Sequence, residues 1–381
     1  MTPSLGTVDE RRLDDPTALQ AADPGRMLLA VASSAAQIRE AQSRVADSEL
    51  GRLAADPRPR AVVVVGMGGS AIAGDVLSAV VGLGSPLPII VHRGFGLPAW
   101  VGPVDVVAAV SCSGRTEETL SAAEEALRRG AQLVGVGAPD SPLAALVAAA
   151  RGPYVGIDVA GRMPRASLWA LSVPLLLIAT HLGLVALPAA AFEAAAERLE
   201  LIAQRCRPDS DSFLNPGKAL ALDLAGSLPI VWGTSPLGGV AAQRLAAQLA
   251  ENAKYPALAG VLPEAGHNQV VTFDGPYAAG DSADFFRDRA EDDERLRLRL
   301  VLLRDLEEHP RVAGRADAVR DLAQARGIPV SAIAAEGAGP LERLASLIAV
   351  VDFASVYLAL LLGIDPSPVG PIDELKARLS G

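Results

Sequence analysis

Short apolar runs alternate with longer helical stretches along most of the chain. The first run, AVVVVGMGG at 61–69, ends in glycines where a helical stretch begins, and similar runs lie at 88–94, 104–114 and 131–139. Strand-like runs separated by helical stretches of about ten residues or more are typical of a parallel sheet with helices on both faces. The pattern therefore predicts an α/β, doubly wound fold.

The same pattern restarts after a polar, proline-containing break at 208–219. New strand-like runs lie at 228–239, 297–305 and 327–333, and a helical stretch extends from 239 to about 254. A repeated supersecondary pattern of this kind indicates two similar halves. We expect an N-terminal helical segment over 1–55, a first domain over 56–190 and a second domain over 191–381.

Two apolar stretches, 167–191 and 344–363, approach the length of a membrane-spanning helix. Pro174 and His181 interrupt the first, and Asp352 lies in the second. Alanine-rich helices buried in large α/β proteins have the same composition. We expect both stretches to be core or subunit-interface helices, with no membrane association.

Composition narrows the classes of protein. The formal net charge is −10, aromatic residues make up 4%, and Lys and Arg form no cluster, so a groove that follows nucleic-acid phosphates is not indicated. Cys112 and Cys206 are too few for a disulfide framework. The N-terminus MTPSLGTVDERRLDD is too acidic and polar for a secretory signal. These features predict a cytoplasmic protein without a nucleic-acid partner.

A glycine-rich turn follows the first predicted strand. Gly66, Gly68 and Gly69 precede Ser70, which opens a helix, so backbone N–H groups at the helix start can face an anion. The third glycine of a dinucleotide fingerprint is displaced, and the acidic residue expected after the next strand is absent. We therefore favour a phosphate-sized ligand over NAD.

Hydroxyl side chains gather in a second turn of this kind, SCSGRTEETL at 111–120. Both turns would lie at the carboxyl edge of the parallel strands, where open α/β sheets bind ligands. Ser70, Ser111, Ser113 and Thr116 then offer hydroxyls, together with helix N-terminal amides, to one phosphate group. The alternative is a plain N-cap at Ser113, which leaves Ser111 and Thr116 without a role.

GMGGSAIAGD and SCSGRTEETL together resemble the sugar isomerase (SIS) domain, whose hallmark is an S-x-S-G-x-T-x-E-T loop around a sugar phosphate. Further motifs follow in the order found in the bifunctional phosphoglucose/phosphomannose isomerase family: MPRAS at 163–167, LAENAKYP at 249–256, PEAGHN at 263–268 and GIDPSPVGPIDELKARL at 363–379. The resemblance covers the chain from about residue 58 to the C-terminus. It implies two SIS-type, flavodoxin-like α/β/α subdomains, the first of which binds the sugar phosphate, with Gly69 among its contacts.

The resemblance also implies an enzyme that interconverts glucose 6-phosphate or mannose 6-phosphate with fructose 6-phosphate through a cis-enediolate. This reaction needs ring opening, a proton carrier between C2 and C1, and positive charge near the developing oxyanion. By similarity, Glu251 carries the proton, His267 opens the ring from a neighbouring subunit, Lys376 contacts the sugar oxygens and Arg165 stabilises the enediolate. Ser367 stands where the family usually has threonine and is implied to allow both C2 epimers.

From the residues alone, these side chains have plainer alternatives. Glu251 points away from the apolar stripe of a regular helix at about 100° per residue, as ordinary exposed glutamates do. His267 lies in a stretch without periodicity, which suits either a surface imidazole or a proton-transfer group. Lys376 fits a solvated helix charge equally well, although lysine occurs only at Lys218, Lys254 and Lys376 among 34 basic residues.

No cofactor is expected, and no metal, because no set of His, Cys, Asp and Glu has ligand spacing. The resemblance implies a homodimer with its sites near the interface. The chain departs from the family pattern at Arg115 (for asparagine), at Cys112 (for tyrosine) and at Gln269, where a glutamate often orients the histidine. A glycine is also missing from ASLWALS after Arg165. Two other classes therefore stay open: a non-catalytic SIS protein that senses a sugar phosphate, and an isomerase of amino-sugar or pentose phosphates.

Overall fold

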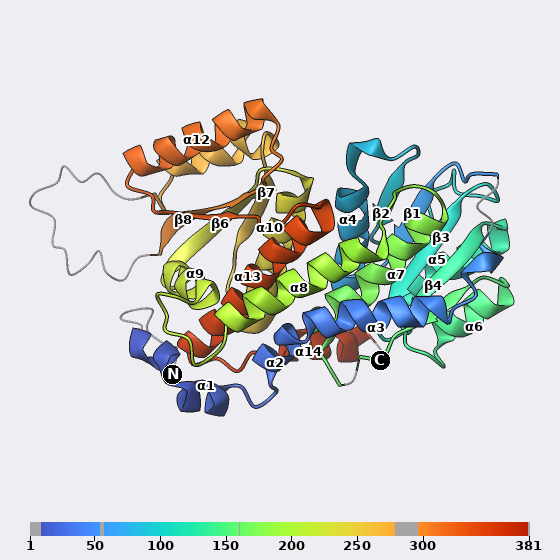
Figure 1. Cartoon of the computed structure of the whole chain (residues 1–381), viewed down its shortest axis with the longest axis horizontal. Helices are drawn as coiled ribbons and strands as arrows, with labels where there is room; N and C mark the ends of the chain where they lie inside the picture. The colour runs from blue at the N-terminus through green and yellow to red at the C-terminus, as the bar shows by residue number, and fades with distance from the viewer. Residues whose placement is uncertain (1–8, 54–56, 160, 279–295, 380–381) are drawn as a thin grey trace, which may run out of the picture. The chain divides into compact units, whose positions relative to one another are not determined.

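The computed structural model describes residues 9–53, 57–159, 161–278 and 296–379, which belong to two compact units. The N-terminal sheet unit comprises Ala32–Glu200 and Ala338–Glu342. The C-terminal sheet unit comprises Met1–Val31, Leu201–Gly337 and Arg343–Gly381. Each unit is built on one parallel sheet with helices packed against it, which confirms the predicted α/β class (Figure 1).

The N-terminal sheet has five parallel strands in the order β2-β1-β3-β4-β5. They are β1 (Val62–Val65), β2 (Ile89–His92), β3 (Val106–Ser111), β4 (Gln132–Gly137) and β5 (Tyr154–Gly156). This is the flavodoxin-like order, in which the winding reverses between β1 and β3. The four predicted strands are present, because buried parallel strands read as continuous apolar runs. The pattern did not predict β5, which is three residues long.

Helices cover both faces of this sheet. The helices are α3 (Ser34–Ala46), α4 (Gly69–Val81), α5 (Glu117–Arg129), α6 (Pro142–Ala149) and α7 (Leu168–His181), followed by the start of α8 (Ala189–Arg205). On one face, Ala122 and Ala126 of α5 pack on Val63 and Val107 in a buried cluster. On the other face, α4 approaches β1 so closely that a Cβ at Gly74 would lie 2.9 Å from Cγ1 of Val64. The unit is therefore doubly wound.

The C-terminal sheet repeats this arrangement with four parallel strands in the order β7-β6-β8-β9. They are β6 (Ser227–Gly233), β7 (Leu258–Val261), β8 (Arg297–Arg304) and β9 (Val330–Ala334). The unit also holds all or most of the helices α1 (Pro16–Ala22), α2 (Met27–Ala32), α9 (Pro216–Leu224), α10 (Pro236–Gln248), α12 (Pro310–Ala325), α13 (Pro340–Leu361) and α14 (Gly370–Leu379). The order matches β2-β1-β3-β4, so the internal repeat predicted from the sequence is present.

Short 3₁₀ turns connect these elements at Glu10–Asp14, Leu50–Arg52, Gly82–Gly84, Pro164–Ala166, Glu264–His267 and Gln269–Asp274. Local sequence fixes several helix starts. Ser141, Asn215 and Ser235 each accept a hydrogen bond from a first-turn N–H, and each is followed by proline at the first helical position. Gly130 ends α5 in the left-handed conformation.

Among the described residues, one helix, α13, is long and apolar enough to cross a membrane, and the whole of its most apolar window is buried within the chain. Its Asp352 forms an ion pair with Arg244 of α10, with Nε and Oδ1 2.8 Å apart. A core helix has this composition and these contacts, as the sequence predicts for 344–363. The shorter α7 is likewise buried along most of its length.

Candidate active site

The carboxyl ends of β1 and β3 form the edge where the winding of the N-terminal sheet reverses. After β1 the chain turns at Gly68, whose φ is +53°, and α4 begins at Gly69. Ser70 is buried in the first turn of α4, and its Oγ accepts a hydrogen bond from the backbone N–H of Cys112, 3.4 Å away. Since Cys112 directly follows β3, the two turns that the sequence predicts to converge do contact each other.

The hydroxyls of the second turn bond to one another and to its backbone. Ser111 Oγ and Thr116 Oγ1 lie 2.9 Å apart, and the exposed Ser113 accepts a bond from the N–H of Arg115 at 3.2 Å. The helix α5 begins at Glu117, so the N-cap position belongs to Thr116, whose side chain makes no capping bond. The alternative of an N-cap at Ser113 is therefore wrong. Without a side-chain cap from Thr116, first-turn N–H groups of α5 can bind an anion.

Gly114 sets the shape of the turn between β3 and α5, residues 111–116, which we call the hydroxyl turn. Its φ is +63°, in the left-handed region, and a Cβ placed there would lie 2.1 Å from Oγ of Ser141. The N–H of Leu143 donates to the Gly114 carbonyl at 3.1 Å. Only glycine fits this position, so the hydroxyl turn is held against the start of α6.

A buried arginine lies next to the start of α4. Arg165 is 3% exposed and sits in the 3₁₀ turn Pro164–Ala166. A Cβ at Gly69 would lie 3.5 Å from the Pro164 carbonyl oxygen and 4.0 Å from Cα of Arg165. Two helix N-termini with a buried cation nearby favour an anionic ligand. The structure thus gathers Gly69, Ser70, Ser111, Thr116 and Arg165 around this edge, with Ser113 in the same turn but exposed.

Cys112 is a neutral thiol at this edge. Burial raises its pKa to about 11, against the opposing influence of the Arg162 charge. Because the thiolate is the nucleophilic form, Cys112 contributes volume to the site and no nucleophile near neutral pH.

Glu251 lies in a π-helical turn, Leu249–Ala253, that continues α10. The sequence predicts a regular helix to residue 254, but the α-helix ends at Gln248, so the α-helical angle assumed for Glu251 does not apply. Turns of this type occur frequently at functional sites. Glu251 is half-buried, which separates it from the fully exposed glutamates of the chain.

Buried polar bonds anchor this turn to α13. Asn252 Nδ2 donates to Ser355 Oγ at 2.9 Å, and Ser355 Oγ donates to the Asp352 carbonyl at 2.7 Å. Arg244 binds both carboxylate oxygens of Asp352 at 2.8 Å each, and Gln248 Nε2 donates to Oδ1 at 3.3 Å. All five side chains are buried. Because a buried polar group left without its partner is costly, this ladder holds the turn in place.

His267 is exposed at the end of the 3₁₀ turn Glu264–His267. Gln269 stands where the family pattern often has a glutamate, which led us to expect the loss of a carboxylate that orients this histidine. In the structure, Gln269 Oε1 accepts a bond from Trp232 Nε1 at 2.6 Å, and Nε2 donates to the Ala259 carbonyl at 3.2 Å. Gln269 therefore anchors the His267 segment to β6 and β7.

Ser367 lies in the loop between α13 and α14. Its N–H donates to Oδ1 of Asp365 at 2.8 Å, and a Cβ at Gly25 would lie 1.9 Å from its Oγ, so the loop packs closely on residue 25. Lys376 is exposed on α14. The C-terminal sheet unit thus contains Glu251, His267, Ser367 and Lys376. The N-terminal sheet unit contains Arg165 and the edge between β1 and β3.

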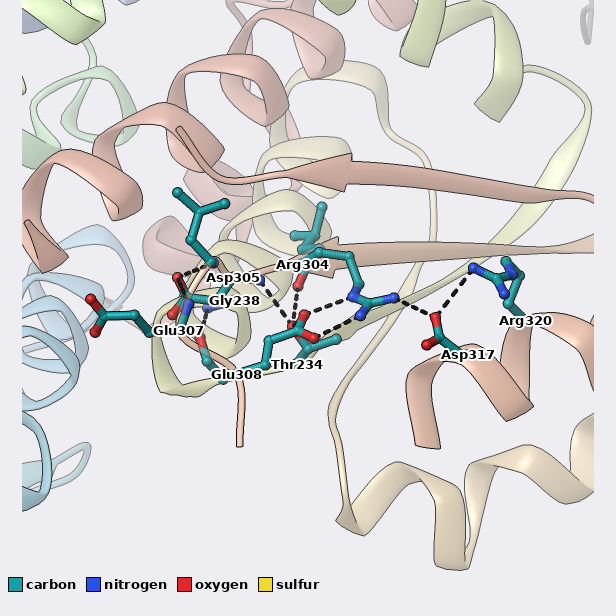
Figure 2. Close-up of polar contacts among 11 residues, drawn as sticks. Thr234, Gly238, Arg304, Asp305, Glu307, Glu308, Asp317 and Arg320 are labelled. Carbon is teal, nitrogen blue, oxygen red and sulfur yellow. Dashed lines mark hydrogen bonds and ion pairs between the residues drawn. The ribbon is translucent and has the colours of Figure 1, made fainter. Parts of the chain in front are cut away.

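The C-terminal sheet has a corresponding edge between β6 and β8 (Figure 2). Thr234 follows β6, and the backbone N–H of Asp305, directly after β8, donates to Thr234 Oγ1 at 3.0 Å. This repeats the bond from Cys112 to Ser70 in the other sheet. The turn after β8 carries carboxylates where the turn after β3 carries hydroxyls.

Glu308 occupies this second edge. Its Oε1 accepts a bond from Thr234 Oγ1 at 2.5 Å, and both its oxygens accept bonds from Arg304 at 2.7 Å. Next to it, Asp305 Oδ1 accepts a bond from Arg343 Nε at 2.8 Å. The carboxylates of Asp305 and Glu308 are 3% and 7% exposed. A phosphate there would meet buried carboxylates already paired with arginines, so the edge between β1 and β3 is the one that suits a phosphate.

Two features of the C-terminal unit were not assigned from the sequence. One is Lys254: the rarity of lysine singled it out in the sequence, but no role was assigned to it. The other is the carboxylate-filled edge, which depends on contacts between Thr234 and Glu308, far apart in the chain. Among the residues that the structure describes, no group of three or more His, Cys, Asp or Glu side chains is arranged to hold a metal ion.

The chain is similar in sequence to proteins of known family. Residues 213–379 match the family described as the bacterial phospho-glucose isomerase C-terminal SIS domain. The chain is 35% identical over 326 residues to the bifunctional phosphoglucose/phosphomannose isomerase of Caldicellulosiruptor bescii, and the match covers 84% of this chain and 89% of the relative. It is 30% identical over 325 residues to the protein of the same name from Aquifex aeolicus, covering 84% and 90%.

Solved structures share the fold at low identity. A hypothetical protein from Thermus thermophilus superposes with a TM-score of 0.68 at 17% identity, covering 98% of this chain and 94% of the other. The C-terminal domain of glucosamine-fructose-6-phosphate aminotransferase from Francisella tularensis gives 0.63 at 12% identity, covering 90% and 98%. These structures bear on the fold alone. The extent and identity of the sequence relatives decide the family: the chain belongs to the bifunctional phosphoglucose/phosphomannose isomerases.

Proposed function

We propose that this protein interconverts fructose 6-phosphate with glucose 6-phosphate and mannose 6-phosphate through a cis-enediolate, without a metal ion. The observation that carries the proposal is the edge between β1 and β3, where Ser70, Ser111 and Thr116 gather beside Arg165 and two helix starts. Hydroxyl donors, backbone amides and one cation suit a phosphate dianion. The names of the relatives support the sugar and the reaction.

The chemistry follows from the acidity of the sugar proton on the carbon next to the carbonyl group. In the open chain, one carboxylate removes the proton from C2 and returns it to C1, while the proton of the C2 hydroxyl passes to the oxygen on C1. We assign the transfer between the carbons to Glu251. The buried ladder to Asp352 supports the assignment, because it fixes the turn that carries the carboxylate. Both C2 epimers give the same enediolate once C2 has lost its proton, so one site serves both aldoses. The charge of Arg165 offsets the developing oxyanion.

The remaining roles rest on the family pattern. We assign ring opening to His267, contact with the sugar oxygens to Lys376, and tolerance of both epimers to Ser367. The exposure of His267 and Lys376 in a single chain supports a homodimer in which the site lies near the interface. A cytoplasmic location fits the two buried, free cysteines Cys112 and Cys206.

The test is isomerisation of fructose 6-phosphate by purified protein in the presence of EDTA, with glucose 6-phosphate and mannose 6-phosphate measured separately. Glu251→Gln keeps the shape of the side chain and removes the base, and Glu124→Gln on the exposed face of α5 is the matched control. We expect both products from the wild type and the control, and a loss of at least about a hundredfold in kcat for Glu251→Gln.

The other function classes give different results. A sugar-phosphate sensor would bind fructose 6-phosphate without forming either product. An isomerase of amino-sugar or pentose phosphates would turn over those compounds faster than fructose 6-phosphate in a substrate profile. Activity that disappears with EDTA and returns with a divalent cation would contradict the metal-independent route.

A further inference from the structure

Lys254 connects two segments of the C-terminal sheet unit through their main chains. Its ammonium donates to the carbonyl oxygens of Glu251 at 2.9 Å, of Asn252 at 3.2 Å and of Asp365 at 3.2 Å. The first two carbonyls belong to the π-helical turn that carries Glu251. The third belongs to the loop that carries Ser367, more than a hundred residues further along the chain. One side chain therefore bonds to both segments.

The bonds of Lys254 match what each segment needs. The last carbonyls of a helix have no partner within the helix, and two of those at the end of this turn accept bonds from Lys254. In the loop, Asp365 also receives the N–H of Ser367 on its carboxylate at 2.8 Å. Moving Asp365 relative to the turn would therefore move the backbone of Ser367 with it.

The inner side of the turn is held separately. Asn252 reaches Ser355 on α13, and α13 is fixed to α10 by the ion pair of Asp352 with Arg244. These groups are buried, whereas Lys254 is exposed. The ladder fixes the turn to the core, and Lys254 fixes the loop to the turn.

We propose that Lys254 is a positioning residue, which holds the Glu251 turn and the Ser367 loop at one fixed separation during the reaction. The inference rests on the proposed function, in which Glu251 moves the proton and Ser367 bears on the choice of epimer. Displacing a reacting group by about an ångström can cost on the order of a hundredfold in rate. Loss of the Lys254 bonds then affects both the rate and the ratio of the two products.

The chemistry of lysine suits this task. An ammonium is a compact charge with three N–H donors that rotate freely, so it can meet three carbonyl oxygens arriving from different directions. A guanidinium offers its donors in one plane and fits such an arrangement poorly. This accounts for a lysine here in a chain whose basic residues are otherwise arginine except at Lys218 and Lys376.

The experiment compares three substitutions. Lys254→Met keeps the length of the side chain without the ammonium. Lys254→Gly also removes the ammonium but suits the backbone, because residue 254 has a φ of +55°. Arg320→Met, on α12, removes a half-buried cation, paired with Asp317 and Asp321, elsewhere in the same unit and is the control. Initial rates from fructose 6-phosphate give kcat, KM and the ratio of glucose 6-phosphate to mannose 6-phosphate.

We expect both Lys254 variants to lose roughly ten- to a hundredfold in kcat, with KM changed by less than about threefold and a shifted product ratio. Arg320→Met should match the wild type in all three quantities. A residue that only ends the helix would be replaced by glycine without penalty. Wild-type kcat and product ratio in Lys254→Gly would therefore overturn the proposal, whatever the methionine variant does.

Hydrogen exchange separates this proposal from the proposed function. Without the bonds of Lys254, the amides of residues 251–255, Asp365 and Ser367 should exchange faster in Lys254→Met than in the wild type, while those of α12 stay unchanged. This result does not depend on turnover. If the wild type forms neither product, the assignment of the reaction fails. Faster exchange would still support a positioning role for the Lys254 bonds. Unchanged exchange in both segments contradicts it.

Discussion

Ser111 and Thr116 place their hydroxyls 2.9 Å apart across the turn between β3 and α5. Thr116 occupies the N-cap of α5, yet its side chain turns to Ser111 and makes no capping bond. Hydroxyls next to a helix start without that cap can donate to an external acceptor, and a phosphate offers several acceptor oxygens.

Removal of one of these hydroxyls should weaken phosphate binding. We expect Ser111→Ala and Thr116→Val to raise the KM for fructose 6-phosphate by roughly ten- to a hundred-and-fiftyfold, since a hydrogen bond to a charged group contributes about 1.5–3 kcal/mol. Thr116→Ser should stay close to the wild type. Ser172→Ala is the control, because its buried hydroxyl has no hydrogen-bond partner among the described residues. An unchanged KM in both hydroxyl variants would remove this turn from the site.

Gly114 should tolerate no side chain. Gly114→Ala meets both an unfavourable φ and the side chain of Ser141, whereas Gly183→Ala has a φ of +67° with open space around the new Cβ. We expect a loss of about 1 kcal/mol in the free energy of unfolding for Gly183→Ala, and at least about 3 kcal/mol for Gly114→Ala. Denaturant unfolding of the two variants gives the difference. Equal losses would show that the clash is relieved at no cost.

The buried thiols make reactivity depend on pH. Burial raises the pKa of Cys112 from the ordinary value of 9.0 to about 11 and that of Cys206 to about 12. Alkylation of Cys112 by iodoacetamide at pH 8 should therefore be slow and should accelerate as the pH approaches 11. Fast labelling of the folded protein at about pH 8, resolved by mass spectrometry, would contradict the buried, neutral thiol.

The same thiols should make stability fall in alkaline solution. A raised folded pKa means that the neutral thiols stabilise the fold fully below the unfolded value of 9.0, and that this contribution declines as the pH rises toward about 11 for Cys112. The double variant Cys112→Ala/Cys206→Ala should lose less stability than the wild type between pH 9 and pH 11. Parallel declines of the two proteins would assign the alkaline loss to other groups.

The buried, arginine-paired carboxylate of Glu308, between β6 and β8, should stabilise the fold. Glu308→Gln leaves Arg304 without its partly buried partner, so we expect a loss of about 3 kcal/mol in the free energy of unfolding. Asp317→Asn removes a partner of the same arginine, but Asp317 is far more exposed, so its loss should be much smaller. Comparable losses in the two variants would mean that burial of Glu308 does not set its contribution.

The pattern of apolar residues predicted most strands correctly, because strands that are buried in the core must be apolar. Strands such as Val62–Val65 are buried on both faces and read as unbroken apolar runs. The strand β7 was not predicted, because its residues are exposed or half-buried and its sequence, LAGV, has no clear period. The π-helical turn at Glu251 was missed for a related reason: its register is set by the ladder to α13, which no local pattern contains.

The site was predicted in part. Convergence of the turns at Ser70 and Ser111 follows from the position of both at the carboxyl ends of neighbouring strands, a relationship that the order of elements already implies. The roles of Glu251 and His267 came from the family pattern and stay predictions. The bond of Lys254 to Asp365 joins segments that only the tertiary structure brings together. The rarity of lysine in the sequence therefore drew attention to Lys254 but did not predict its contacts.

The filled edge at Glu308 has a consequence for the saturation curve. If each chain offers one edge to a phosphate, the two similar halves of one chain cannot act as a cooperative pair. Binding to an isolated chain should then follow a simple hyperbola, with one ligand per polypeptide at saturation. A Hill coefficient above one, measured by titration, would report communication between separate chains, and would be lost on dilution to monomers.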